Sequence, residues 1–313
     1  MASTISTSMV NTFSSNVYHL SQQKDSRIWS LFGRKETVRA EEAYFDTMGT
    51  TEAMEKLSRN ADTTYVDVPY NRRRLTMRDY FWATLVDKED KLRLIHSPES
   101  EQAKAARFAM SRKMDDIAIA ALLGTVYTGK TGATPIVLPD SQKLIAHNEA
   151  GNAFDHFNIS TLRDLKLKFD QNEVEDDNRH IIMSSVEISA LLRDDKMTNS
   201  DYAAVKALVH GEINTFMGFN FIRSERLPVL TSAITTADFT DGSIGDGAGV
   251  VAAGSRRNVA FASSAMIAGI GADATARVTE MPNKHYANQV YMSMTLGAMR
   301  MEEVKVVEII TKA

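Results

Sequence analysis

The longest regular pattern of apolar and polar positions in the chain runs from Ser97 to Gly124. Small and apolar residues recur there at spacings of three and four, which places them on one face of a helix. Ser97 is a suitable N-cap, Pro98 fits the first helical position, and Gly124 can supply the left-handed residue that commonly ends a helix. The pattern predicts a helix over residues 97–123, about 40 Å long at a rise of about 1.5 Å per residue. Its predicted apolar stripe consists of Ala103, Ala106, Met110, Met114, Ile117 and Ala121.

A long helix with one apolar face needs a sheet or a second layer along it. Near the end of the chain, apolar and polar residues alternate with the period of two that is typical of a half-buried strand. We therefore expect the terminal strands to form the sheet against which the helix lies. These predicted strands cover residues 258–270, 289–301 and 304–310.

The middle of the chain mixes shorter helical and extended patterns, which predicts an α+β fold. Residues 40–62 show no clean period, and residues 140–158 read as a polar loop. The predicted elements are a helix over 161–171 capped by Ser160, a strand over 180–184, helices over 186–192 and 202–209, and an extended pair over 216–223 around Gly218.

A long hairpin is predicted from residues 65–68 and 75–86, which are rich in β-branched and aromatic residues. Its expected turn or tip, residues 70–74, contains Arg72, Arg73 and Arg74. Such a charge run on a loop is commonly a solvated surface. The alternative is a docking tip, because guanidinium groups bind carboxylates or phosphates of a partner. A hairpin that stands clear of its domain is marginal in water and would need a neighbour.

The first 38 residues read as a polar arm with scattered large apolar anchors. These anchors must bury themselves on another surface, either the same subunit or a neighbouring chain, and the sequence leaves both alternatives open. They are Val17, Tyr18, Leu20, Ile28, Trp29, Leu31 and Phe32.

Composition limits the classes of function. The 313 residues are 43% hydrophobic, enough for a sizeable core. A net charge of −4 lacks the basic excess of a typical nucleic-acid-binding domain. The absence of cysteine excludes disulfides and thiolate chemistry and fits an intracellular origin. We find no signal peptide and no apolar run long enough for a membrane span, so no membrane partner is expected.

Residues Gly124–Thr131 satisfy the P-loop pattern G-x-x-x-x-G-K-[ST], with Lys130 and Thr131 in the functional positions. A P-loop follows a strand and opens a helix, so that backbone N–H groups point at phosphate. Here the pattern follows a predicted helix, and Pro135 and Pro139 come after it. Nucleotide binding is therefore the less favoured alternative.

No other pattern indicates catalysis, a cofactor or a metal. The seven histidines form no H-E-x-x-H motif, and the chain has no G-x-S-x-G elbow. Asp115 and Asp116 are adjacent on a helix and point about 100° apart, so they cannot face each other as an acid–base pair. We expect one or both on the solvated face. The glycine-rich stretch from Thr235 to Arg257 is predicted to be a loop, without the spacing of a calcium loop.

Five segments of the chain resemble the major capsid proteins of tailed bacteriophages in amino-acid sequence and in the order of their elements. They are VYHLSQQKDSR (17–27), VDVPYNRRRLTMRDYFWATLVDKEDKLRL (66–94), AMSRKMDDIAIAALLGTVYTG (109–129), NSDYAAVKALVHGEINTFMGFNFIRSERLP (199–228) and MPNKHYANQVYMSMTLGAMRMEEVKVVEI (281–309).

The resemblance implies the α+β fold of tailed-phage capsids, in which a hairpin, the extended loop, lies over the neighbouring subunit. The parts would be an N-terminal arm, an extended loop, a peripheral domain built on a spine helix, and a mixed axial domain. The implied bounds are 1–39 for the arm, 40–91 for the extended loop, 92–173 and 275–313 for the peripheral domain with its spine helix at 97–123, and 174–274 for the axial domain.

The resemblance also implies a structural role with no catalytic residue and no cofactor. The subunit would assemble with itself into pentamers and hexamers that form an icosahedral head around double-stranded DNA, located in the virion and assembled in the host cytoplasm. Because the chain begins directly with the arm, a separate scaffolding protein is expected. Further implied partners are a portal protein, a decoration or cement protein, and DNA through local non-specific contacts.

Candidate inter-subunit contacts are Arg72, Arg73 and Arg74, with Tyr18, Trp29 and Phe32 of the arm. The alternatives are a P-loop enzyme that uses residues 124–131, or another ring-forming virion protein such as a portal or tail ring. No motif indicates a covalent Lys–Asn crosslink between subunits.

Overall fold

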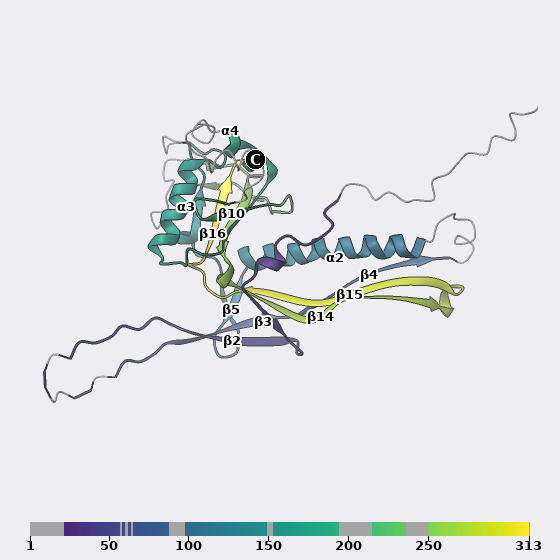
Figure 1. Ribbon diagram of the computed structural model, residues 1–313, viewed down its shortest axis with the longest axis horizontal. Coiled ribbons are helices and arrows are strands. Elements are labelled where there is room, and N and C mark those ends of the chain that lie inside the picture. Colours follow the sequence, from purple (N-terminus) through teal and green to yellow (C-terminus); the bar gives the residue numbers. More distant parts are fainter. Residues whose placement is uncertain are drawn as a thin grey trace, which may run out of the picture. The chain divides into compact units, whose positions relative to one another are not determined.

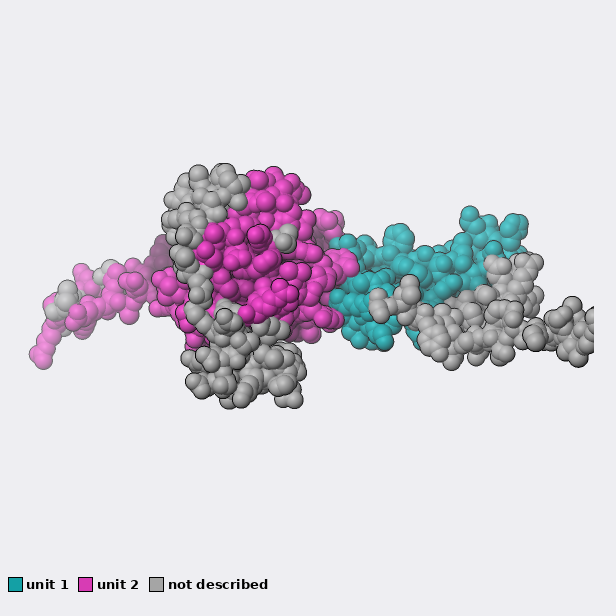
Figure 2. All heavy atoms as spheres, turned by 90° about the horizontal axis from the view of Figure 1, so that it is seen from above, with its two compact units in different colours: residues 1–25, 79–113, 272–295 teal, residues 26–78, 114–271, 296–313 magenta. Residues whose placement is uncertain are grey.

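The computed structural model describes residues 22–56, 58–59, 62–63, 65–87, 98–148, 153–193, 215–235 and 250–312. The chain divides into two compact units, which are coloured separately in Figure 2. Unit 1 comprises Met1–Asp25, Asp79–Lys113 and Ala272–Thr295, and unit 2 comprises Ser26–Arg78, Met114–Gly271 and Leu296–Ala313.

The predicted long helix is present as α2, Pro98–Leu123. Gly124 ends it and donates its N–H to the Ala120 carbonyl at 2.8 Å. The expected left-handed conformation is wrong, because Gly124 is not among the glycines with positive φ. The missing side chain matters for another reason, since a Cβ at Gly124 would collide with the Ala120 carbonyl oxygen.

In unit 1, the first part of α2 runs alongside three strands (Figure 1). They are β4 (Arg78–Val86), β14 (Met266–Met281) and β15 (Ala287–Arg300), and the sheet order is β1-β14-β15-β4. The predicted alternation in β15 is confirmed, because Val290, Met292, Met294 and Leu296 are all buried. The Lys113 ammonium lies 5.2 Å from the centre of the Tyr80 ring of β4.

Unit 2 contains a six-stranded sheet with the order β7-β16-β13-β8-β10-β9. The central strand β8 is parallel to β10 and antiparallel to β13, and β16 is parallel to β7. The strands are β7 (Lys143–Ile145), β8 (Arg179–Met183), β9 (Thr215–Phe216), β10 (Phe219–Arg223), β13 (Arg256–Ala262) and β16 (Val306–Thr311).

The prediction that the terminal strands form one sheet under the helix is therefore wrong. β13 and β16 pair with each other in the six-stranded sheet, whereas β14 and β15 belong to the sheet beside α2. The three residues of η5, Ser263–Ala265, separate β13 from β14. Two consecutive apolar strands can enter different sheets at such a break, and their local patterns do not distinguish the sheets.

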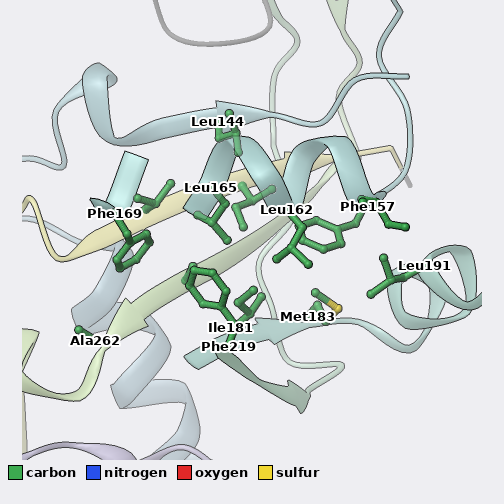
Figure 3. Close-up of a cluster of buried hydrophobic side chains, with 14 of the residues drawn as sticks. Leu144, Phe157, Leu162, Leu165, Phe169, Ile181, Met183, Leu191, Phe219 and Ala262 are labelled. Atoms are coloured by element: carbon green, nitrogen blue, oxygen red, sulfur yellow. The ribbon is translucent and has the colours of Figure 1, made fainter. Parts of the chain in front are cut away.

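Helices α3 (Ile159–Gln171) and α4 (Ser185–Arg193) pack against the six-stranded sheet (Figure 3). The Phe169 and Phe219 rings meet edge to face at 5.6 Å. The predicted cap Ser160 is wrong, because the Asn158 side chain accepts the Thr161 N–H at 2.9 Å. The buried cluster includes Leu144, Phe157, Leu162, Leu165, Phe169, Ile181, Met183, Leu191, Phe219 and Ala262.

The predicted hairpin is wrong in its pairing. β3 (Tyr70–Thr76) pairs antiparallel with β2 (Glu42–Met48), which comes from the region without a clean period, and not with the following strand β4. Arg72–Arg74 therefore lie within β3 and not at a tip. The order of this sheet is β2-β3-β5-β6, completed by β5 (Val126–Thr128) and β6 (Thr134–Ile136).

A second core cluster lies where β3 ends, and two glycines allow its close packing. A Cβ on Gly297 would lie 2.6 Å from the Thr76 carbonyl oxygen and 3.0 Å from Met77 Sδ. A Cβ on Gly269 would lie 2.6 Å from Leu75 Cδ2 and 2.9 Å from Met77 Sδ. The cluster consists of Val38, Phe45, Leu75, Met77, Ile267, Met299 and Met301.

The remaining elements are short. They are β1 (Arg34–Thr37), the pair β11 (Ile234–Thr235) and β12 (Val250–Val251), and the 3₁₀ turns η2 (Trp29–Leu31), η3 (Asp140–Gln142) and η6 (Pro282–Lys284). The predicted helix at 202–209, and residues 236–249 of the glycine-rich stretch, lie outside the described residues. Within the described ranges, no helix is long and apolar enough to cross a membrane.

Candidate functional site

Arg72 and Arg74 point to acids on the adjacent strand β2. Arg72 donates Nε to Asp46 Oδ1 at 2.7 Å and Nη2 to Oδ2 at 3.0 Å. Arg74 donates Nη1 to Glu42 Oε1 at 3.1 Å, and its guanidinium lies 4.8 Å from the centre of the Tyr127 ring. The hydrogen bonds that Arg72 donates to Asp46, followed by the charge of Asp46, raise the pKa of Arg72, and the same hydrogen bonds lower the pKa of Asp46.

Arg73 points away from these two and is buried. It donates Nη1 and Nη2 to the two carboxylate oxygens of Glu303 at 2.5 and 2.7 Å. The fully buried Arg300 also lies near Glu303, with its Nε 3.7 Å from Oε1. Arg300 also donates Nη1 to the Leu122 and Gly124 carbonyls at 2.6 and 3.2 Å, where the negative end of the α2 dipole favours a cation.

This buried network, Arg73–Glu303–Arg300, shifts the pKa of two of its members. Burial raises the pKa of Glu303, but the hydrogen bonds and charge of Arg73 outweigh burial, so the pKa lies below its ordinary value. Burial lowers the pKa of Arg300, although the nearby Glu303 charge opposes this effect. Glu303, in the segment before β16, is thus connected to strand β3 through Arg73 and to the end of α2 through Arg300.

The arm is held by Asp115, which is fully buried. Of the two adjacent acids expected wholly or in part on the solvated face, Asp116 is the partly exposed one. The Ser26 hydroxyl donates to Asp115 Oδ1 at 2.5 Å, and the backbone N–H groups of Arg27 and Ile28 donate to the carboxylate at 3.2 and 3.1 Å. A carboxylate that accepts several backbone N–H groups fixes the local conformation of the chain. Asp115 therefore anchors the arm where it enters unit 2.

Two of the three candidate inter-subunit contact residues of the arm are described. Trp29 and Phe32 are buried, with ring centres 5.7 Å apart, and Phe32 meets Phe261 of β13 edge to face at 6.3 Å. Both rings thus pack within unit 2 of the same chain. Tyr18 lies outside the described residues.

Asp116, the neighbour of Asp115, pairs with Arg226 through two hydrogen bonds of 2.5 Å. The pair borders an open pocket of about 390 Å³ lined also by Ile119, Leu123, Pro228 and Arg257. Arg257 is itself paired with Glu308 of β16. The two guanidinium groups around this pocket are thus already neutralised by acids of the same chain.

The P-loop pattern at residues 124–131 has the wrong structure for phosphate binding. It follows a helix, contains strand β5, and ends in the turn that leads to β6, which pairs antiparallel with β5. Positive φ at Gly129 and Gly132 serves this turn. No helix follows Lys130 directly, so the nucleotide-binding alternative is not supported.

Two histidine–carboxylate contacts hold the chain around α3 and α4. His147 Nε2 lies 2.8 Å from Asp164 Oδ2, and its Nδ1 lies 2.9 Å from the Asn148 carbonyl oxygen. His156 Nδ1 lies 3.4 Å from the buried carboxylate of Glu187, which accepts the Phe157 N–H at 2.7 Å. Within the described part of the chain, no group of three or more His, Asp or Glu side chains could hold a metal ion.

Sequence reasoning missed Asp115 and Glu303 as structural residues. Asp115 could have been identified by its spacing, because it precedes the buried Ile119 by four residues and so shares its face of the helix. No local signal marks Glu303, because its partner Arg73 is 230 residues away in the sequence.

Comparison with known proteins gives a consistent result. A family model described as a phage capsid protein matches residues 5–312. No curated protein matches the sequence significantly.

Many solved structures share the fold at low sequence identity. The capsid of cyanophage P-SCSP1u is 13% identical with a TM-score of 0.71, covering 100% of this chain and 95% of that chain. The capsid of cyanophage Pam1 is 10% identical with a TM-score of 0.71, covering 100% and 98%. The capsid of Ralstonia phage GP4 is 11% identical with a TM-score of 0.69, covering 98% and 96%.

Proposed function

Because this chain belongs to the phage capsid protein family, in which its role is structural, we propose that it forms the icosahedral head of a tailed phage by assembling into pentamers and hexamers. The observation that carries this proposal is the family match over residues 5–312. The likeness in fold to phage capsids over nearly the whole chain supports it.

The proposed division of labour follows the resemblance. Residues 1–39 are the arm, 40–91 the extended loop that reaches a neighbouring subunit, and 174–274 the axial domain. Residues 92–173 and 275–313 form the peripheral domain, with α2 as its spine. The two proposed domains share one sheet, in which β7 and β16 of the peripheral domain join β8 and β13 of the axial domain.

The proposed partners are a separate scaffolding protein, a portal protein, a decoration protein and packaged double-stranded DNA. Assembly would take place in the host cytoplasm. Among the candidate contact residues that the structure describes, Arg72 is the best placed for a neighbour, since its side chain is 43% exposed, whereas Arg73 is 9% exposed and bound to Glu303.

Electron microscopy of the full chain, expressed alone and with its neighbouring genes, tests the proposal. Closed shells, or rings of five and six subunits, are the expected result. A uniform monomer in both preparations would overturn the proposal.

A charge change then tests the contact residue. Arg72→Glu should lower the yield of particles without changing the melting temperature of the subunit, because the pair with Asp46 is exposed. Lys130→Glu is the matched control, since Lys130 is exposed in the same part of the fold and its change of charge is identical. Equal particle yields for the two variants would exclude Arg72 from the contact.

A further inference from the structure

Both guanidinium groups of the buried network have N–H groups without an acceptor. The Arg300 side chain is 0% exposed, and its Nη1 donates to the carbonyls of Leu122 and Gly124. Within the described part of the chain, Arg300 Nε and Nη2 have no hydrogen-bond partner, and neither does Arg73 Nε. Because Nε carries one N–H and Nη2 carries two, three donors of Arg300 are left over.

The same network carries more positive than negative charge. Both cations share one carboxylate oxygen, because Glu303 Oε1 lies 2.5 Å from Arg73 Nη1 and 3.7 Å from Arg300 Nε. Burial lowers the pKa of Arg300, the charge of Glu303 opposes this effect, and the charge of Arg73 adds to it. The end of α2 supplies only about half a negative charge through its carbonyls. An excess of positive charge therefore remains where neither guanidinium is more than 9% exposed.

Free donors and excess charge in one place indicate a bound anion. A buried polar group without a partner is unfavourable, and a buried charge without a counter-charge is more so. A water molecule accepts N–H groups but leaves the excess charge in place. An anion removes both costs, and guanidinium groups bind anions through charge-assisted hydrogen bonds.

The surroundings favour a small monovalent anion from solution. The neighbouring acid Glu302 does not supply the missing charge, because it pairs with Lys305 at 3.3 Å. Solvent comes close to the network, since the Glu303 side chain is 17% exposed and the open pocket of about 390 Å³ reaches Leu123 and Gly124 at the same end of α2. The excess is less than one full charge, so a divalent anion such as phosphate would reverse it.

We propose that Arg73 and Arg300 bind a small monovalent anion, of which chloride is the common example, where β3, the segment before β16 and the end of α2 meet. The anion accepts hydrogen bonds from the donors that Glu303 and the helix end leave free. It acts with Glu303 to stabilise the folded subunit. This site goes beyond the proposed function and does not depend on it, because it lies within a single chain.

Thermal unfolding of the full-length subunit tests the proposal when sodium gluconate is exchanged for sodium chloride at constant ionic strength. A ligand that binds only the folded state raises its stability. The melting temperature should rise and then level off, by about 2 °C when chloride reaches about ten times its dissociation constant. A melting temperature that does not depend on chloride would overturn the inference.

Three variants locate the effect. Arg300→Met removes the main donor and should abolish the chloride dependence. Lys305→Met is the matched control, since Lys305 is a cation of the same segment that is 15% exposed and paired with acids, and it should keep the dependence. Glu303→Gln enlarges the excess of positive charge, so the rise in melting temperature with chloride should become steeper. Equal chloride dependence in Arg300→Met and the unsubstituted chain would overturn the inference.

A crystal of the subunit grown in sodium bromide gives a readout of position, and it needs no variant that folds poorly. Bromide replaces chloride and is visible by its anomalous scattering. A peak within hydrogen-bond distance of Arg300 Nη2 is expected. Bromide peaks elsewhere on the subunit with none at Arg300 would overturn the inference, and either result leaves the proposed function intact.

Discussion

Strands β8 and β16 of the six-stranded sheet in unit 2 and the outer part of β14 in unit 1 are opposite extremes of burial. Every residue of β8 and β16 is buried, whereas every residue from 272 to 280 of β14 is exposed. The six-stranded sheet is covered by α3 and α4 and has a core of its own (Figure 3). The edge of β14 has no such cover within the described chain. One region is thus complete within a single chain, and the other leaves a surface suited to a partner.

Substitutions in the buried cluster between the six-stranded sheet and its helices should affect the isolated subunit most. Phe169→Ala removes a fully buried ring that contacts Phe219, and such truncations cost about 3 to 5 kcal/mol. Denaturant unfolding of the isolated subunit measures this loss. Leu167→Ala on the same helix is the matched control and should change stability far less, since Leu167 is about half exposed. Equal losses would show that this core is not what stabilises unit 2.

The buried network should come next in size. Glu303→Gln leaves Arg73 and Arg300 without a carboxylate. Loss of one partner of a buried ion pair costs about 3 kcal/mol at the lower end of the usual range, which applies here because the Glu303 side chain is 17% exposed. The exposed neighbour Glu302, which pairs with Lys305 at 3.3 Å, provides the control Glu302→Gln. If both variants unfold at the same denaturant concentration, the network does not stabilise the fold.

Acid should remove the difference in stability between the unsubstituted chain and Glu303→Gln. The pKa of Glu303 is lowered in the folded chain, so its ionised form stabilises the fold above the ordinary pKa of about 4.3. This contribution is lost as the pH falls through the lowered pKa. Melting temperatures measured from pH 7 to pH 3 should converge between the unsubstituted chain and Glu303→Gln at the acid end. A constant difference across this range would contradict the prediction.

The glycine contact at the end of β3 should have a smaller effect. Gly297→Ala brings a Cβ to 2.6 Å from the Thr76 carbonyl oxygen, and overpacking of this kind costs about 1 to 3 kcal/mol. Ser293→Ala, at a half-buried position of the same strand, is the control for thermal unfolding. An unchanged melting temperature for Gly297→Ala would show that β3 can shift away from β15 without loss.

The smallest effect on the isolated subunit is expected in the sheet beside α2. Phe81 is 72% exposed on β4 and stacks on Tyr291 at 6.3 Å. Phe81→Ser should leave the melting temperature unchanged, because little apolar area is lost from the core. Val86→Ser, at a buried position of the same strand, should lower it. If Phe81→Ser destabilises the subunit as much as Val86→Ser, this face is already covered within the chain.

Elements whose residues interact with near neighbours in the chain were predictable from local sequence patterns. The helix at Pro98–Leu123, the alternation of β15 and the turn between β9 and β10 follow from periods of 3.6 and 2 and from Pro and Gly signals. The capsid family was also predictable from the amino-acid sequence, and the family match over residues 5–312 confirms this prediction.

The pairing of distant segments and the burial of charges could not be predicted in this way, because both depend on long-range packing. β2 shows no clean period, yet it is the partner that makes Arg72–Arg74 part of a strand. Asp115 is buried because residues of the arm that precede it by 87 to 89 positions pack against the helix. Glu303 is ionised because it binds Arg73, which precedes it by 230 positions. Local periodicity reports how one segment divides between core and solvent. It carries no information on which distant segment supplies the other half of a sheet or the partner of a charge, because that choice depends on packing across the whole chain.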